Sequence, residues 1–139
     1  VPELVARLLV ARNIPQDNVE SFLFPSLQRD FPDPFKLEGM KDAAAHIADD
    51  IIAGRRVGAF CDFDVDGSTS AAILSRFFRS CGQELEIYIP DRHAEGYGPN
   101  IKGVEDLKSR GAQHIIFCDC GISAHSVIQS ARNLDLHVT

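Results

Sequence analysis

Short apolar runs alternate with amphipathic segments through the second half of the chain. Four runs are evenly apolar: residues 56–61, 85–89, 114–118 and 137–139. Three segments with helical spacing of apolar side chains separate them: residues 69–81, 101–110 and 124–134. The runs are too short for a helix and predict buried β-strands. Strands that alternate with helices predict an α/β fold with a doubly wound parallel sheet.

The first part of the chain predicts helices without strands. Helical spacing of apolar residues occurs in three segments: residues 2–13, 16–24 and 40–53. Residues 31–35 contain two prolines and predict extended chain, because proline disfavours the helical conformation in the residue before it. We therefore expect a helical lead-in segment over residues 1–37 and an α/β domain over residues 38–139.

Carboxylates follow two of the predicted strands. Asp62, Asp64 and Asp66 alternate directly after the first strand, and Asp119 follows the third. Because the carboxyl ends of parallel strands meet at one rim of a sheet, we expect Asp119 to approach Asp64 and Asp66. Crowded carboxylates repel one another unless a cation or shared protons neutralise them. The pattern therefore predicts a divalent-metal site.

Two other kinds of protein share part of this acidic pattern. The stretch from Asp62 to Gly67 has the alternating acids and glycine of a calcium-binding EF-hand. The twelfth position of that loop must be glutamate and here is Ile73, which excludes it. The stretch from Asp64 to Ser68 resembles the nucleophile motif of haloacid-dehalogenase-like phosphatases, in which Asp64 would attack phosphorus. A small-molecule phosphatase is therefore an alternative.

Composition narrows the possible partners. The 139 residues carry a net charge of −6, whereas nucleic-acid-binding domains usually present a basic surface. A nucleic-acid substrate would therefore be held mainly by regions absent from this chain. No apolar run approaches the roughly 20 residues that span a bilayer, and residues 1–7 do not form a signal peptide. We expect a cytoplasmic protein without a membrane partner.

Four motifs, in order, resemble those of DHH-superfamily phosphoesterases of the RecJ type. They are the acidic stretch 61–70, the loop with Ile-Pro-Asp-Arg at 89–92 and Glu-Gly-Tyr-Gly at 95–98, the segment Phe-Cys-Asp-Cys-Gly-Ile-Ser at 117–123, and the lead-in stretches 22–27, 33–35 and 40–43. Phe63 stands where that family usually has tyrosine, and Pro99 replaces an aliphatic residue. The Asp-His-His signature of the superfamily would lie beyond Thr139, so the chain resembles an amino-terminal portion of such a protein.

The resemblance implies a single-strand-specific exonuclease that degrades DNA from the 5′ end in recombination and repair. It implies Mn²⁺ or Mg²⁺ as cofactor, with two ions in the complete enzyme, and little activity in this chain alone. It implies catalytic metal ligands at Asp64, Asp66 and Asp119, with Asp62 behind them orienting a ligand. The expected substrate-binding residues are Ser68, Thr69, Arg92, Tyr97 and Asn100. His93 and His125 lie near the predicted rim but match no ligand position of the family.

Overall fold

The computed structural model describes all 139 residues, which form two compact units, Val1–Met40 and Lys41–Thr139. The first unit is helical: α1 (Glu3–Ala11), η1 (Gln16–Asn18), α2 (Val19–Leu23), α3 (Leu27–Asp30) and η2 (Pro34–Lys36). Its only buried side chain is Leu9. The expectation of extended chain over residues 31–35 is wrong in part, because η2 forms there. Asp33 accepts a hydrogen bond from the Phe35 amide at 3.0 Å and thereby caps this turn.

The second unit contains a four-stranded parallel sheet, as the sequence predicted. Its elements are, in chain order, α4 (Met40–Ile52, starting at the last residue of the first unit), β1 (Val57–Cys61), α5 (Val65–Ser80), β2 (Glu86–Tyr88), α6 (Ile101–Ser109), β3 (His114–Cys118), α7 (His125–Asn133) and β4 (His137–Val138). The strand order is β2-β1-β3-β4, and every neighbouring pair is parallel. Strands β1 and β3 therefore lie side by side although α5, β2 and α6 separate them in the chain.

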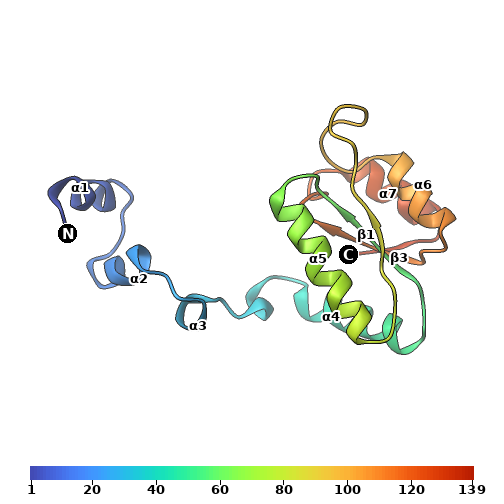
Figure 1. Cartoon of the computed structure of the whole chain (residues 1–139), viewed down its shortest axis with the longest axis horizontal. Helices are drawn as coiled ribbons and strands as arrows, with labels where there is room; N and C mark the ends of the chain where they lie inside the picture. Colours follow the sequence, from blue (N-terminus) through green and yellow to red (C-terminus); the bar gives the residue numbers. More distant parts are fainter. The chain divides into compact units, whose positions relative to one another are not determined.

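Helices cover both faces of this sheet (Figure 1). Side chains of β1 alternate between the faces: Val57 packs with Phe78 of α5, and Phe60 packs with Leu107 of α6. Helix α4 joins α5 on the first face, and α7 joins α6 on the second. The chain thus leaves the neighbouring strands β1 and β3 toward opposite faces. Ligands of such doubly wound sheets bind outside the carboxyl ends of the strands at this switch point.

Helix α5 begins at Val65, four residues before the predicted start at residue 69. The side chain of Asp64 causes the early start, because it accepts hydrogen bonds from the amides of Asp66 and Gly67, each at 3.1 Å. A Cβ atom on Gly67 would lie 2.2 Å from the carbonyl oxygen of Asp62. Glycine at this position therefore lets the helix begin directly beside the end of β1.

Candidate metal centre

Three carboxylates gather at the carboxyl rim of the sheet. Ligand oxygens of Asp62, Asp64 and Asp119 all lie within 4.8 Å of one another. The first two follow β1 and the third follows β3, the strand beside it. The side chain of Asp62 is buried, whereas Asp64 and Asp119 are exposed. Asp119 thus lies close to Asp64 across the neighbouring strands β1 and β3.

Asp66 does not join this group of three, and Asp62 occupies the place that was expected for it. Strand β1 ends at Cys61, and Val65 and Asp66 already belong to the first turn of α5, so the alternation expected of a strand does not extend to Asp66. A helical turn rotates successive side chains by about 100° instead of placing alternate ones on one side. The roles of Asp66 as a ligand and of Asp62 as an orienting residue stay predictions.

Lost hydration and like charge both oppose ionisation at this rim. Lost hydration and the negative charges of Asp64, Asp66 and Asp62 raise the pKa of Asp119. None of the ion pairs of the chain involves these four carboxylates. Asp62 accepts one hydrogen bond, from the amide of Phe63 at 2.8 Å. Hard divalent cations prefer such clustered carboxylate oxygens, so the donor set fits Mn²⁺ or Mg²⁺.

The backbone at Asp119 adopts a left-handed conformation, with φ of 59°. Few residues other than glycine take up this conformation, although aspartate and asparagine tolerate it better than most. Gly121 follows with φ of 101° and lies against the ring of Phe117. The chain thus bends sharply after β3 and directs Asp119 toward Asp64. Unusual backbone conformations of this kind cluster at functional sites.

Residues of the loop between β2 and α6 contact Phe63, which stands between two of the clustered acids. The Arg92 guanidinium carbon lies 5.3 Å from the centre of the Phe63 ring. The Tyr97 ring meets the same ring edge-on at a centroid distance of 6.2 Å. Tyr97 is 77% exposed, so most of its surface is available to a ligand. Two of the five predicted substrate-binding residues therefore lie next to the acidic motif.

A shallow depression of about 460 Å³ adjoins the centre. Its lining comes from Phe63 and the first turns of α5: Phe63, Asp64, Val65, Ser68, Thr69 and Ala72. Ser68 and Thr69 lie inside the helix instead of at its amino end. The Ser68 amide donates to the Asp64 carbonyl at 2.9 Å, and the Thr69 hydroxyl donates to the Val65 carbonyl at 2.8 Å. The Ser68 amide is therefore not free for a phosphate, and contacts of these two residues with a ligand would involve their hydroxyl groups.

Asn100 caps helix α6, as its position before residue 101 predicted. Its side-chain oxygen accepts from the Gly103 amide at 2.8 Å, and its amide nitrogen donates to Glu95 at 3.0 Å. The predicted contact of Asn100 with substrate stays a prediction. Glu95 was not singled out from the sequence as a site residue. Tyr88, its phenolic partner at the end of β2, was the available signal.

His93 and His125 lie outside the carboxylate group. The backbone amide of His93 donates to Asp91 at 2.8 Å, and its side chain is exposed. His125 begins α7 and is also exposed.

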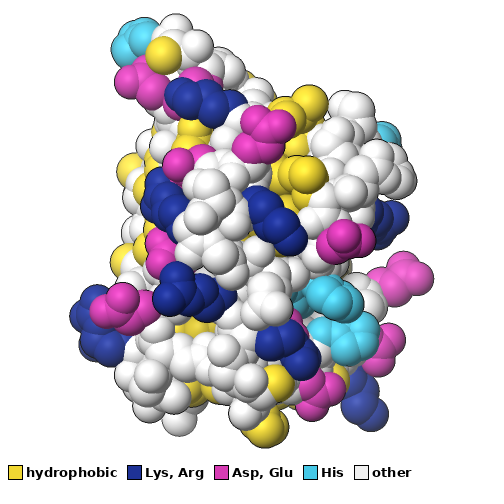
Figure 2. Space-filling view, turned by 90° about the vertical axis from the view of Figure 1, so that its right-hand side faces the viewer, with side chains coloured by type: hydrophobic (Ala, Val, Ile, Leu, Met, Phe, Trp, Pro, Cys, Tyr) yellow, Lys and Arg dark blue, Asp and Glu magenta, His cyan; other side chains and the backbone are white.

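On the face drawn in Figure 2, basic and acidic side chains are interspersed, and no basic patch gathers there. Across the whole chain, no helix has the length and apolar character needed to cross a membrane.

Comparisons with known proteins identify the sequences and structures that this chain resembles. The chain is 36% identical over 138 residues to the single-stranded-DNA-specific exonuclease RecJ of Bacillus subtilis, and the match covers 99% of this chain. It is 35% identical over 104 residues, or 74% of this chain, to the RecJ of Escherichia coli. A crystal structure of exonuclease RecJ bound to manganese superposes with a TM-score of 0.66 and 30% identity, over 73% of this chain and 26% of the other.

The matched relatives are much longer proteins. The chain spans 18% of the length of the Bacillus subtilis relative and 18% of the Escherichia coli relative. The sequence profile described as "DHH family, N-terminal domain" matches residues 56–139, the part that carries the sheet and the three clustered carboxylates. The resemblance inferred from the four sequence motifs is confirmed, and the chain belongs to the DHH family.

Proposed function

We propose that this chain carries part of the active site of a metal-dependent exonuclease that degrades single-stranded DNA from the 5′ end. The observation that carries the proposal is the convergence of Asp62, Asp64 and Asp119 within 4.8 Å, without a compensating cation from the chain. The relatives are named single-stranded-DNA-specific exonucleases, and two similar crystal structures are described as manganese complexes. By the same resemblance, the protein would act in DNA recombination and repair.

The three clustered carboxylates would hold Mn²⁺ or Mg²⁺ at the rim. Such a cation, when bound, supplies charge for the phosphate oxygens and lowers the pKa of a bound water. Asp66, two residues after Asp64, is close enough to raise the pKa of Asp119 and would add a fourth carboxylate to the site. Asp66 or Asp119 would be the carboxylate that two bound ions share. Metal binding requires these carboxylates in the ionised form.

The residues around Phe63 would hold the substrate. The exposed ring of Tyr97 offers a surface on which a base can stack, and the Arg92 guanidinium can pair with a phosphate. Ser68 and Thr69 line the adjoining depression, where their hydroxyl groups would face the sugar-phosphate backbone. The excess of acids means that the rest of the DNA would be held by other parts of a longer protein. A DNA substrate would place the protein in the cytoplasm.

A small-molecule phosphatase is the second candidate, favoured by one observation. The chain carries 20 acidic and 14 basic residues, and a polyanion gains little from such a surface. A small phosphate ester would need only the rim itself. The two candidates share the metal centre and differ in the size of the substrate, so they are separated by substrate tests instead of by metal binding.

The metal centre is tested first by titration calorimetry of the chain with Mn²⁺. We expect Asp64→Asn and Asp119→Asn to weaken Mn²⁺ binding at least tenfold, since each removes an anionic ligand. Asp49→Asn changes the same charge at an exposed position of α4 and should leave binding unchanged. Equal affinity of all four proteins would remove the metal centre from the proposal.

The reaction is tested in a chimera in which residues 1–139 replace the matching segment of the Bacillus subtilis RecJ. With Mn²⁺ and 5′-labelled single-stranded DNA, we expect nucleotide release that EDTA stops and that Asp64→Asn abolishes. The 139-residue chain alone should release none at an appreciable rate. A chimera that hydrolyses p-nitrophenyl phosphate but leaves DNA intact would favour the phosphatase.

A further inference from the structure

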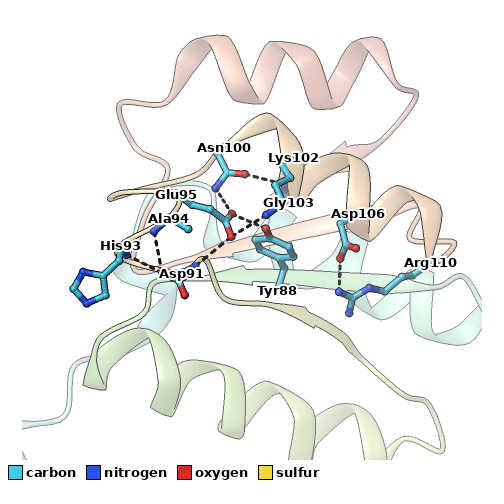
Figure 3. A network of polar contacts seen from close by, with 10 residues as sticks. All are labelled: Tyr88, Asp91, His93, Ala94, Glu95, Asn100, Lys102, Gly103, Asp106 and Arg110. Atoms are coloured by element: carbon cyan, nitrogen blue, oxygen red, sulfur yellow. Dashed lines mark hydrogen bonds and ion pairs between the residues drawn. The ribbon is translucent and has the colours of Figure 1, made fainter.

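The carboxylate of Glu95 collects four hydrogen-bond donors from three parts of the chain (Figure 3). One oxygen accepts from the Tyr88 hydroxyl at 2.6 Å and from the Asn100 side-chain amide at 3.0 Å. The other accepts from the Lys102 ammonium at 3.2 Å and from the Asp91 backbone amide at 3.3 Å. The Glu95 side chain is only 12% exposed. Both of its oxygens are therefore used inside the protein.

This network keeps one protonation state over a wide pH range. The hydrogen bond from Tyr88, with those from Asp91, Lys102 and Asn100, lowers the pKa of Glu95 to about 2. Burial and the hydrogen bond to Glu95 raise the pKa of Tyr88 to about 12. The carboxylate stays ionised and the phenol stays neutral between these values. Glu95 is thus unsuited to exchange a proton with a substrate and is suited to hold its neighbours in place.

The partners of Glu95 belong to the fixed frame of the domain. Tyr88 ends β2 with 9% of its surface exposed, and its ring lies 5.2 Å from that of Phe60 in the core. Gly103 of α6 packs so tightly against Tyr88 that a Cβ atom there would lie 2.6 Å from its ring. Asn100 is the cap of the same helix. Glu95 therefore fastens the middle of the loop to both β2 and α6.

Two residues of the same loop contact Phe63. Arg92 precedes Glu95 by three positions and Tyr97 follows it by two, and both contact the Phe63 ring. The loop turns at Gly96 and Gly98, on either side of Tyr97, and their φ angles of 80° and 86° favour glycine. The contacts of Glu95 with β2 and α6 and those of Arg92 and Tyr97 with Phe63 are thus parts of one loop conformation.

We propose that Glu95 is a positioning residue: by binding Tyr88, Asn100 and Lys102 it holds the 90–100 loop so that Arg92 and Tyr97 rest on Phe63 beside the carboxylate centre. Its importance for catalysis depends on the proposed function, since Arg92 and Tyr97 are the residues assigned to the substrate. The loop conformation itself does not depend on that assignment, and this allows the two to be tested separately.

The test uses the tyrosine rings of the chain as reporters. The chain contains two tyrosines, Tyr88 and Tyr97, and no tryptophan, so ¹³C-labelled tyrosine gives one set of NMR signals for each. We expect Glu95→Gln to reduce the Tyr97–Phe63 ring contact at least twofold, measured as the nuclear Overhauser effect between the two rings. Glu105→Gln, the same change at an exposed position of α6, should leave it unchanged.

A second variant tests the same contact in case the Glu95→Gln protein does not fold. Tyr88→Phe removes only the donating hydroxyl and keeps the buried ring, so a smaller loss of the same contact is expected. Circular dichroism confirms that each variant is folded. A Tyr97–Phe63 contact that stays at the wild-type level in both folded variants would overturn the proposal, even if their melting temperatures fall.

Mn²⁺ alone serves as the probe that links the loop to the metal centre. Paramagnetic Mn²⁺ at the carboxylates should broaden the Tyr97 signals of the wild type, and the broadening should fall at least twofold in Glu95→Gln relative to that of Tyr88. Absence of any broadening in the wild type would count against the metal centre, while the ring contact would still decide the role of Glu95. Unchanged Tyr97 broadening in the variant would contradict that role.

Discussion

Aspartate side chains lie at both ends of the sheet, but in different surroundings. At the amino end, Asp50 of α4 is 4% exposed, accepts a hydrogen bond from His114 Nδ1 and pairs with Arg55. The other ring nitrogen of His114 lies 2.8 Å from the Thr139 hydroxyl. At the carboxyl end, Asp119 faces three other carboxylates and no cation of the chain.

The two ends show how neighbours decide the role of a carboxylate. Burial opposes the charge of Asp50, but hydrogen bonds from His114 and Arg55 outweigh it and lower the pKa of Asp50. Lost hydration and neighbouring negative charges raise the pKa of Asp119. A buried acid with its own partners stabilises the fold by linking α4 to β3. An acid that lacks partners leaves its oxygens available for a ligand, at a cost to stability.

The largest expected effect comes from breaking the pair at the amino end. Asp50→Ala leaves the buried His114 ring nitrogen without its hydrogen-bond partner, and an unsatisfied buried polar group typically costs about 1–3 kcal/mol. We expect a fall of about 2 kcal/mol in the free energy of unfolding, measured by urea denaturation. Asp49→Ala removes a neighbouring exposed carboxylate of the same helix and is the control. Equal stability of the two variants would show that the Asp50–His114 contact contributes nothing.

Acidification should act on the two ends with opposite sign. The folded pKa of Asp50 is depressed, so its contribution to stability is present above the ordinary value of 3.8 and is lost as the pH falls below it. The folded pKa of Asp119 is raised, so its contribution is present below 3.8 and is lost as the pH rises through the folded value. Stability in metal-free buffer should therefore rise slightly on mild acidification and then fall.

Two variants show which carboxylate causes each change in stability with pH. Asp119→Asn should remove the rise above pH 3.8, and Asp50→Asn should reduce the fall below it, to which Glu95 also contributes because its pKa is lowered to about 2. Thermal unfolding followed by circular dichroism between pH 2.5 and about 7 measures both, a window chosen to span the ordinary carboxyl pKa. A profile that is unchanged in both variants would mean that other carboxyl groups control the acid response.

The smallest expected effect is a gain in stability at the rim. Asp119→Asn removes a charge from a repelling group, and asparagine tolerates the left-handed backbone at this position. We expect a small rise in melting temperature at neutral pH without metal, and a smaller stabilisation by Mn²⁺ than in the wild type. A variant that melts below the wild type in metal-free buffer would show that Asp119 stabilises the fold.

The arrangement of the sheet was accessible from the sequence because it depends on repeated patterns. Even apolar runs between amphipathic segments fix the parallel order, and neighbouring parallel strands bring residues 62–64 and 119 to one rim. The same patterns did not show which of Asp62, Asp64 and Asp66 lie in the group with Asp119. Membership of this group depends on the residue at which strand geometry changes to helix geometry, and the Asp64 cap moves that point four residues earlier than the apolar spacing suggested.

The network around Glu95 was less predictable from the sequence than the carboxylate group. Its donors come from β2, the loop and α6, and the loop that joins these elements turns at Gly96 and Gly98. No periodicity encodes such a contact. A glutamate in an exposed loop and a tyrosine at a strand end are each ordinary on their own. Only the three-dimensional distance of 2.6 Å between Glu95 and the Tyr88 hydroxyl joins them.

The position of β3 beside β1 also has a consequence for the order of folding. The amides that Asp64 caps lie in the first turn of the helix that follows it, so this contact is local. The group of three carboxylates requires β3 to pair with β1, and α5, β2 and α6 lie between these strands in the chain. Contacts between such distant segments form slowly, because the intervening loop must close first. A nascent or partly folded chain without the β1–β3 pairing therefore lacks the metal centre. A gain in Mn²⁺ affinity during folding would report that β1 and β3 have paired.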